Sequence, residues 1–460
     1  MKFDWVSGVL TLTIAVTGSW LTLRKTEWPK APQDPQNILI ISICSFRSDL
    51  LTAFSKDKQV TMPNVEKFFS RGSIVVQNSF NGVPWTSLFD FFKPYTAILE
   101  ELGVQVLSGF RSYPYVRVPP RRSFAHPELK AVDDNNFEKT FEPSGIELRR
   151  RIFAARDRPF FLIAHFKYMH YPLIDRINAD SEWDYYLNPE EKEVIQDLVD
   201  HPDRHLISLP FLMLLENDPK VAKLDSDIRN RSKDLRSRDL AGLVANKELL
   251  DRWRKSPNFP KEKVILEKIY RANARYLDKK LAPLLNLYGD RDLQKRTVVM
   301  LTGDHGEVHM ERGELTHAIS VFDESLRIPT LMKFPNSGGR NQVIQEQTHL
   351  GDLSYLVSEI LKGHVREAEV PKTLAKARED TLVLRDCLNA VRGIRYKNTY
   401  KYIVDNSSGQ RFLFDLKRDP LEKVNVAPDH PEMVEFLETE YWRRYWMFTS
   451  VPTKRCPDWS

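Results

Sequence analysis

The sequence predicts an α/β fold in which helices flank a mostly parallel central sheet, followed by a small antiparallel subdomain at the C-terminal end. Three apolar runs support the sheet, at Asn37–Ile43, Pro159–Ala164 and Thr297–Leu301. They do not alternate between apolar and polar residues, which is typical of strands buried on both faces of a parallel sheet. The segments between them are long and largely helical in pattern, so we expect helical connections between the strands.

The length and composition indicate a large globular protein and exclude several classes. The 460 residues are 42% hydrophobic and 28% charged, which is enough apolar surface for a sizeable core. The chain has 68 basic and 63 acidic residues, and its net charge of +5 gives no support for nucleic-acid binding. Only three cysteines occur, Cys44, Cys387 and Cys456, so a disulfide-dense scaffold and a four-cysteine zinc module are excluded.

The N-terminal segment is the candidate for membrane targeting. Residues 5–23 contain no charged side chain and are bounded by Asp4 and Arg24. This length suits a membrane span, and the shorter apolar core Val9–Val16 suits a secretory signal equally. We therefore expect residues 1–25 to be a membrane anchor or signal segment, residues 26–36 to be a linker, and the protein to be membrane-anchored or secreted and extracytoplasmic.

Helical periodicity dominates the connections between the strands. Met62–Arg71 is expected to be a helix, and residues 184–265 are expected to form a mostly helical insertion over the sheet. A further helix is expected over Lys268–Leu285, where apolar residues recur at helical spacing. Pro283 can end or kink this helix early, because proline lacks the amide hydrogen that the helix interior needs.

The residue pattern changes from mainly helical to strands and turns after about residue 380. Tyr400–Val404 and Arg411–Asp415 flank an Asn-Ser-Ser-Gly turn and predict a hairpin. A final helix is expected over Pro431–Tyr445. The expected organisation is therefore a main domain over residues 37–380 and a small antiparallel sheet with a packed helix over residues 381–450.

Polar side chains of the metal-ligand type begin where the three apolar runs stop. Cys44 follows the first run, His165 and His170 follow the second, and Asp304 with His305 follow the third. In open α/β sheets the site lies at the carboxyl ends of the strands, so these segments are expected to converge on one crevice. Neighbouring aspartate and histidine at a strand end suit a divalent metal, with a simple capping turn as the alternative.

Several blocks in the sequence resemble, in the expected order, the sulfatase family of the alkaline phosphatase superfamily. The most specific is Thr302–Glu307, which reads Thr-Gly-Asp-His-Gly-Glu. The other blocks are Asn37–Asp49, Met62–Val65, Val83–Ser87, His165–Pro172, Tyr276–Asp278, Glu311–His317, Phe322–Pro329, Met332–Pro335, Arg395–Lys397, Leu413–Leu416 and Asp419–Pro420. The resemblance implies a three-layer alkaline-phosphatase/sulfatase-like fold and a hydrolase or transferase that acts on phosphate or sulfate esters.

The resemblance places the nucleophile at Thr86. Sulfatases carry a Cys-x-Pro-x-Arg run there, whose cysteine is converted to formylglycine, but this chain reads Thr-Ser-Leu-Phe-Asp from residue 86. Formylglycine is therefore not expected. Threonine at this place is similar to the phosphotransferase branch of the superfamily, and a hydroxyl next to a metal is a reasonable attacking group. The alternative is that Thr86 is an ordinary helix N-cap.

The resemblance also places an acidic metal ligand at the position of Cys44. A thiolate binds zinc but is a poor ligand for calcium or magnesium. Cys44, Thr86, Asp304 and His305 are therefore the candidate ligands of one divalent ion, with zinc or manganese favoured. The alternative is that the ligand and the metal have both been lost.

Two histidines match positions that contact the substrate or serve the leaving group, His170 and His317. Imidazole titrates near neutral pH and suits a general acid. With Thr86 they are the candidate catalytic residues of an esterase or transferase.

Arg47, Lys167 and Arg312 are the candidate substrate-binding residues. An arginine can hold an oxyanion with two parallel hydrogen bonds, although Arg47 can instead pair with Asp49.

A second function is also consistent with the sequence. The chain departs from the family pattern at Cys44, Phe89, Asp90 and Arg312. These departures favour a catalytically degenerate protein that keeps the fold as a binding or assembly module.

Overall fold

The computed structural model describes most of the two predicted folded regions. The described residues are 15–16, 19–20, 37–55, 59–84, 105–108, 160–166, 168–170, 173, 180–201, 247–317, 320–337, 339–378, 380–386 and 390–448. Thr86, Lys167, Cys387, Cys456 and the linker 26–36 lie outside them.

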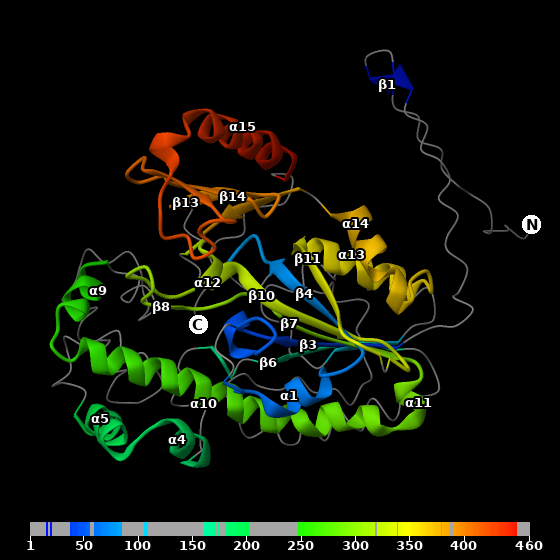
Figure 1. The fold of residues 1–460 in the computed structure, drawn as a ribbon, viewed down its shortest axis with the longest axis horizontal. Helices are drawn as coiled ribbons and strands as arrows, with labels where there is room; N and C mark the ends of the chain where they lie inside the picture. Colours follow the sequence, from blue (N-terminus) through cyan, green and yellow to red (C-terminus); the bar gives the residue numbers. More distant parts are fainter. Residues whose placement is uncertain are drawn as a thin grey trace, which may run out of the picture.

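A seven-stranded sheet forms the centre of the molecule, in the order β11-β4-β10-β7-β3-β6-β5 (Figure 1). The strands are β3 (Asn37–Ile43), β4 (Ser73–Phe80), β5 (Gln105–Ser108), β6 (Phe160–Phe166), β7 (Thr297–Gly303), β10 (Arg327–Lys333) and β11 (Gln342–His349). Only β10 pairs antiparallel with its two neighbours, and the other four pairings are parallel. Six of the seven strands therefore run in one direction, which confirms the predicted fold class.

The two central strands are buried along their whole length, as their apolar sequences predict. Every residue of β3 and of β7 is buried, and alternate side chains enter the cores on opposite faces. Burial of a large aliphatic side chain contributes roughly 1.5–3 kcal/mol, so these strands form the most strongly held part of the sheet. The strand β6 extends to Phe166, which places His165 inside the strand rather than after it.

Helices cover both faces of the sheet and make a three-layer arrangement (Figure 1). The first face packs against residues of α1 (Pro63–Phe68), α5 (Pro189–Asp200), α9 (Lys247–Arg254) and α10 (Phe259–Asn286). The second face packs against α13 (Leu350–Leu361) and α14 (Val370–Ala377). The short elements near these layers are η1 (Ser48–Leu50), α4 (Asp180–Tyr186), η5 (Leu287–Gly289), α11 (Arg291–Gln294) and η6 (Glu367–Glu369).

Two helices differ from their predicted lengths. The helix α1 stops at Phe68, earlier than predicted, and the chain turns at Gly72, whose φ is 61°. In contrast, α10 continues through Pro283 to Asn286, so the proline does not end it. The burial of Leu284 and Leu285 in the core holds the last turn in place, which overrides the local cost of the proline.

The C-terminal region forms a separate antiparallel sheet, as predicted. Its strands follow one another in the order β12 (Thr381–Arg385), β13 (Val391–Tyr396), β14 (Tyr400–Asp405) and β15 (Arg411–Asp415). One face packs on Phe80 and Leu326 of the main body, and the other is covered by α15 (Pro431–Phe448), with η7 (Ala427–Asp429) before it (Figure 1).

The predicted membrane segment lies almost entirely outside the described residues. Within it, the structure describes only the short strands β1 (Ala15–Val16) and β2 (Ser19–Trp20), which pair antiparallel. A search of the described part of the chain finds no helix with the length and apolar character to cross a membrane.

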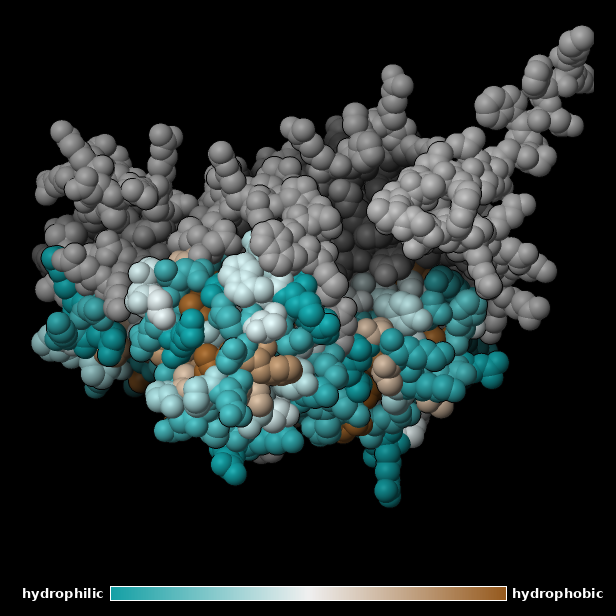
Figure 2. All heavy atoms as spheres, turned by 90° about the horizontal axis from the view of Figure 1, so that it is seen from above, coloured by the Kyte–Doolittle hydropathy of each residue, from teal (hydrophilic) through white to brown (hydrophobic). Residues whose placement is uncertain are grey.

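The described surface offers no broad apolar patch on the face that Figure 2 shows. This face is mainly hydrophilic, and hydrophobic side chains come to the surface in small separate groups. Scattered exposed apolar residues are ordinary on soluble domains, so this face gives no indication of a docking surface.

One buried carboxylate ties α1 to α10. The side chain of Asp278, which is fully buried, accepts hydrogen bonds from the backbone amides of Asn64 and Val65 at 3.0 and 2.8 Å and from the Asn64 amide group at 2.8 Å. These amides belong to the first turn of α1, where the helix itself supplies no acceptor.

We predict that Asp278→Ala lowers the free energy of unfolding by about 2–3 kcal/mol, because it leaves buried amides without an acceptor. Urea unfolding followed by circular dichroism measures this. Glu267→Ala, an exposed acidic position on the same helix, is the matched control and should change stability by less than about 0.5 kcal/mol. Equal stabilities for the two variants would contradict the proposed capping role.

Candidate active site

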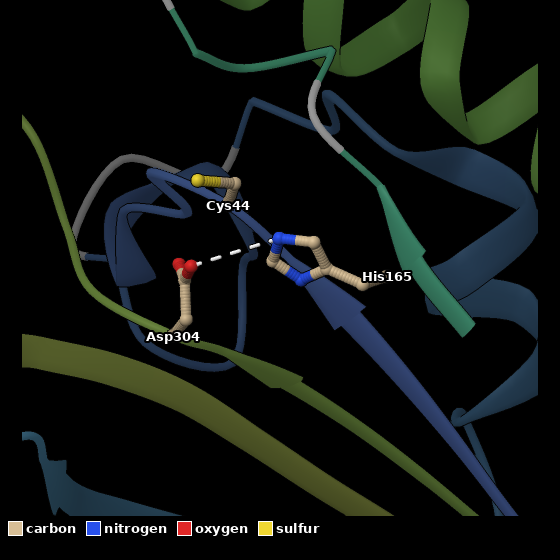
Figure 3. A group of neighbouring side chains, drawn as sticks. All are labelled: Cys44, His165 and Asp304. Carbon is tan, nitrogen blue, oxygen red and sulfur yellow. Dashed lines mark ion pairs between the residues drawn. The ribbon is translucent and has the colours of Figure 1, made fainter. Parts of the chain in front are cut away.

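Three side chains from three adjacent strands meet at the carboxyl edge of the sheet. The strand β3 lies between β6 and β7, and its Ser42 is in register with His165 on one side and Thr302 on the other. The chain beyond β3 and β7 then brings Cys44 and Asp304 next to His165 (Figure 3). The ligand atoms of Cys44, His165 and Asp304 all lie within 4.8 Å of one another, and all three side chains are buried.

Backbone hydrogen bonds hold the two loops that carry Cys44 and Asp304. The amide of Cys44 donates to the carbonyl of Phe166 at 2.8 Å, and the amide of Asp304 donates to that of Ile43 at 3.3 Å. Ser45 adopts φ = 56°, a left-handed conformation that is uncommon for serine, and its carbonyl accepts a hydrogen bond from Tyr270. Such strain tends to gather at functional sites, where surrounding contacts maintain it.

The two oxygens of Asp304 face different partners. Oδ1 accepts the amides of Ser45 at 3.2 Å and His305 at 2.8 Å, whereas Oδ2 lies 3.8 Å from Nε2 of His165. The amide side chain of Asn81 donates to the backbone carbonyl of Asp304 at 2.7 Å. The carboxylate is therefore fixed in orientation, with one oxygen directed at the cluster.

His305 approaches the cluster from the other side. Its Nε2 lies 3.6 Å from Sγ of Cys44 and 3.7 Å from Oδ1 of Asp304. Its Nδ1 donates to the carbonyl of Gly306 at 2.7 Å, because a carbonyl can only accept. Burial lowers the pKa of His305, against an attraction by Asp304 that raises it. The neutral ring therefore turns the lone pair of Nε2 toward Cys44.

Gly306 has a steric role in this loop. A Cβ atom at this position would lie 2.0 Å from the backbone oxygen of Glu324. The close approach lets the amides of Gly306 and Glu307 donate to Ser325 and Glu324, at 2.7 and 3.0 Å. These residues belong to α12 (Asp323–Leu326), so the loop after β7 is attached to that short helix.

A row of imidazole rings extends from the cluster. The ring centroids of His305 and His317 are 4.2 Å apart, and those of His317 and His170 are 4.9 Å apart. Nδ1 of His317 lies 3.0 Å from Oε2 of the buried Glu307. Burial raises the pKa of Glu307, but its interaction with His317 outweighs this, so the pKa lies below its usual value. Glu307 therefore carries a negative charge, and its contact with Nδ1 fixes the orientation of His317.

The two arginines predicted to bind substrate have partners within the protein. Arg47 makes a two-pronged contact with Asp49, at 3.1 and 2.8 Å, and also contacts Glu311 at 2.5 Å. The pair with Asp49 was the alternative that the sequence left open. Arg312 donates to the backbone carbonyls of Leu421 and Glu422, at 2.5 and 2.7 Å, and so attaches the loop after β7 to the C-terminal region.

The structure brings together most of the predicted site and adds two residues. Cys44, Asp304 and His305 share the carboxyl edge, with His170 and His317 beside them, whereas Thr86 and Lys167 lie outside the described residues. The site prediction did not include His165 among the metal ligands or Glu307 as the partner of His317. His165 had a usable signal, because it ends an apolar run exactly as Cys44 does. The contact between Glu307 and His317 had no signal in the sequence, since it depends on the path of the loop between these two residues.

Two short strands complete this loop, β8 (Val308–His309) and β9 (Leu315–Thr316), which pair antiparallel. Their hairpin carries the segment between Glu307 and His317 back toward the sheet. The return of the chain explains why two residues ten positions apart can share a hydrogen bond.

Comparisons with known proteins agree with this geometry. The family model described as Sulfatase matches residues 147–363, a range that contains His165, Asp304, His305 and His317. Arylsulfatase K of Gallus gallus is 29% identical over 187 residues, covering 37% of this chain and 35% of that protein. Arylsulfatase K of Homo sapiens is 28% identical over 194 residues, with the same coverage. The match therefore spans about a third of the length of these curated relatives.

Solved structures share the fold over nearly the whole chain. A putative sulfatase from Bacteroides fragilis superposes with a TM-score of 0.55 at 15% identity, covering 91% of this chain and 97% of that one. The phosphonate monoester hydrolase of Agrobacterium radiobacter gives a TM-score of 0.56 at 15% identity, covering 89% and 96%. A third structure, in complex with its substrate D-glucosamine-2-N,6-O-disulfate, gives 0.54 at 12% identity, covering 93% and 100%. At these identities the likeness shows the fold alone.

The chain therefore has the fold of the solved sulfatase structures. The Sulfatase family model matches residues 147–363, which is less than half of the chain, and this part of the chain is similar to sulfatases.

A buried histidine near the site gives stability a pH dependence. His309 packs edge-on against Tyr270, with ring centroids 4.5 Å apart. Burial lowers its pKa to about 4, and repulsion by Arg47 adds to this, while Glu311 opposes it. Because the folded pKa is below the unfolded value near 6.5, the unfolded chain binds the proton first. The stability is present above pH 6.5 and falls as the pH drops toward 4.

In the wild type, His309 makes the unfolding free energy fall by up to about 1.4 kcal/mol per pH unit more steeply between pH 6.5 and 4. We predict that His309→Gln removes this contribution and makes the decline with falling pH shallower. Chemical unfolding at several pH values measures the slope. His364→Gln is the control, since the His364 side chain is 58% exposed, and should leave the slope unchanged. A slope that His309→Gln does not alter would show that other groups dominate acid unfolding.

Proposed function

We propose that this protein is a metal-dependent sulfatase-family enzyme that cleaves or transfers a sulfate or phosphate ester, with Thr86 as the nucleophile. The main support is the buried cluster of Cys44, His165 and Asp304 at the carboxyl edge of the sheet. Its thiol, imidazole and carboxylate are side-chain types that bind divalent ions in proteins.

The residues of the cluster fit a divalent ion. Within the cluster, Asp304 supplies a carboxylate and Cys44 a thiol that binds metals as the thiolate. Beside the cluster, His305 offers a lone pair on Nε2 whose direction is set by the bond from Nδ1 to Gly306. When bound, such an ion neutralises negative charge and lowers the pKa of a nearby hydroxyl. The presence of sulfur and nitrogen donors favours zinc or manganese over calcium or magnesium.

The chemical step uses residues of this chain. The hydroxyl of Thr86 gives its proton to a water molecule, and its oxygen bonds to the sulfur or phosphorus of the ester. The bond from that atom to the alcohol oxygen breaks, and the leaving oxygen takes a proton from His170 or His317. Water then cleaves the threonine ester in a hydrolase, or a second alcohol accepts the group in a transferase.

The arrangement of His317 supports a role as the general acid. Glu307 holds its Nδ1 at 3.0 Å, which leaves Nε2 as the atom that exchanges protons. Glu307 is itself buried, so the position of this contact is fixed by the packing around it.

The relatives favour sulfate and phosphorus esters as the substrate class. Arylsulfatase K and the phosphonate monoester hydrolase are named for such substrates, and one structural neighbour holds a sulfated glucosamine. We extend to this chain only the shared feature, a tetrahedral anionic ester.

We predict that Thr86→Ala lowers turnover of an aryl sulfate or aryl phosphate by roughly a thousandfold or more, while Thr86→Ser keeps measurable activity, because serine retains the attacking hydroxyl. Steady-state release of the phenol measures both. Thr399→Ala, in the turn between β13 and β14, is the matched control and should keep full activity. Full activity in Thr86→Ala would remove threonine from the mechanism.

A catalytically degenerate binding or assembly module is the second candidate. It is supported by Arg47 and Arg312, two of the three cationic residues expected to hold the substrate anion, which both have partners inside the protein. Introducing Cys44→Asp restores the acidic residue that the family resemblance implies. Activity that appears only in this variant would favour the module, whereas turnover by the unmodified chain would favour the enzyme.

We also propose that the protein acts outside the cytoplasm, anchored or secreted through residues 5–23. The support is the uncharged sequence of that segment. Deletion of residues 1–25 should leave a reporter fusion inside the cell, and unchanged export after the deletion would contradict the proposal.

A further inference from the structure

We propose that His165 is a metal ligand, and that Cys44, His165 and Asp304 together hold a zinc ion with one coordination position left for a group from outside the set. This inference rests on the proposed function only for the presence of an ion at the sheet edge. It adds a ligand that is not among the four implied by the family resemblance, and it specifies the metal and the number of protein ligands.

The distances fit three ligands around one small ion. Two atoms bound to zinc at tetrahedral angles lie about 3.4–3.6 Å apart. Nε2 of His165 and Oδ2 of Asp304 are separated by 3.8 Å, and all pairs among the three ligand atoms lie within 4.8 Å. For His165 and Asp304, closure onto an ion requires movements of well under an ångström.

The surroundings already orient the ligand atoms. Nδ1 of His165 lies 3.0 Å from the hydroxyl of Ser42, which can accept the proton that the ring must carry there when Nε2 binds a metal. Ser42 and His165 are paired in register on neighbouring strands, so the contact is held by the sheet itself. On the other side, the amides of Ser45 and His305 hold Oδ1 of Asp304 and leave Oδ2 facing the histidine.

The donor set selects zinc over harder ions. Calcium takes six to eight oxygen ligands and magnesium needs octahedral oxygen coordination, whereas this cluster offers one sulfur, one nitrogen and one carboxylate. Sulfur, nitrogen and oxygen ligands at four-coordinate geometry are those that zinc accepts. A thiolate and a carboxylate also balance the charge of a divalent ion, which favours burial of the complete site.

His305 is placed beside this set rather than in it. Its Nε2 lies 3.6 Å from Sγ of Cys44 and faces Oδ1 of Asp304, the oxygen that already accepts two backbone amides, whereas His165 faces Oδ2. Three protein ligands with one remaining position is the arrangement of catalytic zinc sites, whereas four protein ligands is that of structural sites.

The first experiment measures metal affinity and needs no substrate. Competition with a chromogenic chelator should show that the purified full chain binds one zinc ion. His165→Gln and Cys44→Ser should each weaken binding about a hundredfold or more, and Ser42→Ala about tenfold through the orientation of the ring. His349→Gln, a histidine that caps α13, is the matched control and should bind zinc as the wild type does.

The second experiment reads the ligands directly. Cobalt(II) substituted into the site should show a near-ultraviolet thiolate-to-metal absorption, which Cys44→Ser removes and Cys387→Ser and Cys456→Ser retain. Inorganic phosphate added to the cobalt protein should shift the visible bands, because one position accepts an outside ligand. Circular dichroism of each metal-free variant checks that it is folded.

The outcomes separate this inference from the proposed function. Zinc affinity unaffected by His165→Gln in a folded variant would overturn the assignment of His165. If His305→Gln lost as much zinc affinity as His165→Gln, and phosphate did not shift the visible bands of the cobalt protein, the ion would have four protein ligands. That result would overturn the open coordination position. Tight zinc binding that depends on His165, without any ester turnover, would support this inference and reject the proposed enzyme instead.

Discussion

The site depends on the backbone pairing of one strand with two others. Because β3 lies between β6 and β7 and runs parallel to both, the residues at and beyond their carboxyl ends meet at a single edge. The register of Ser42 with His165 and Thr302 fixes the position of each candidate ligand along the strand direction. A slip of one residue would turn His165 to the opposite face of the sheet. The hydrogen-bond ladder of these strands thus determines which side chains can share an ion.

A second set of contacts connects this edge to the C-terminal sheet. The loop after β7 donates backbone hydrogen bonds to α12, and Asp323 at the start of α12 pairs with Arg395 at 2.6 Å and Lys401 at 2.8 Å. Lys401 also contacts Glu422 at 2.6 Å, and its side chain is fully buried. Breaking one partner of such a buried network leaves an uncompensated charge, which is far costlier than losing a surface ion pair. The C-terminal subdomain therefore supports the geometry of the site although it contributes none of the candidate ligands.

The character of the cluster differs from the one that the family resemblance implies. A carboxylate expected at the end of β3 is replaced by Cys44, and a histidine of β6 stands beside it. The exchange replaces an oxygen donor by a sulfur and a nitrogen donor. Under the proposed function, the same fold would present a softer metal site without any change in topology, because the strand ends supply positions and not particular residues.

The sequence alone predicted the fold class and several of the candidate site residues. Uniformly apolar runs identify β3 and β7, since only strands covered on both faces can bury every side chain. The polar residues after those runs identify Cys44, Asp304 and His305. Only the folded chain shows that His165 lies beside Cys44, that Arg47 pairs with Glu311, that Arg312 donates to Glu422, and that α10 continues through Pro283. These features depend on contacts between residues more than one hundred positions apart or on burial that overrides local preference, and neither is written in any short stretch of the chain.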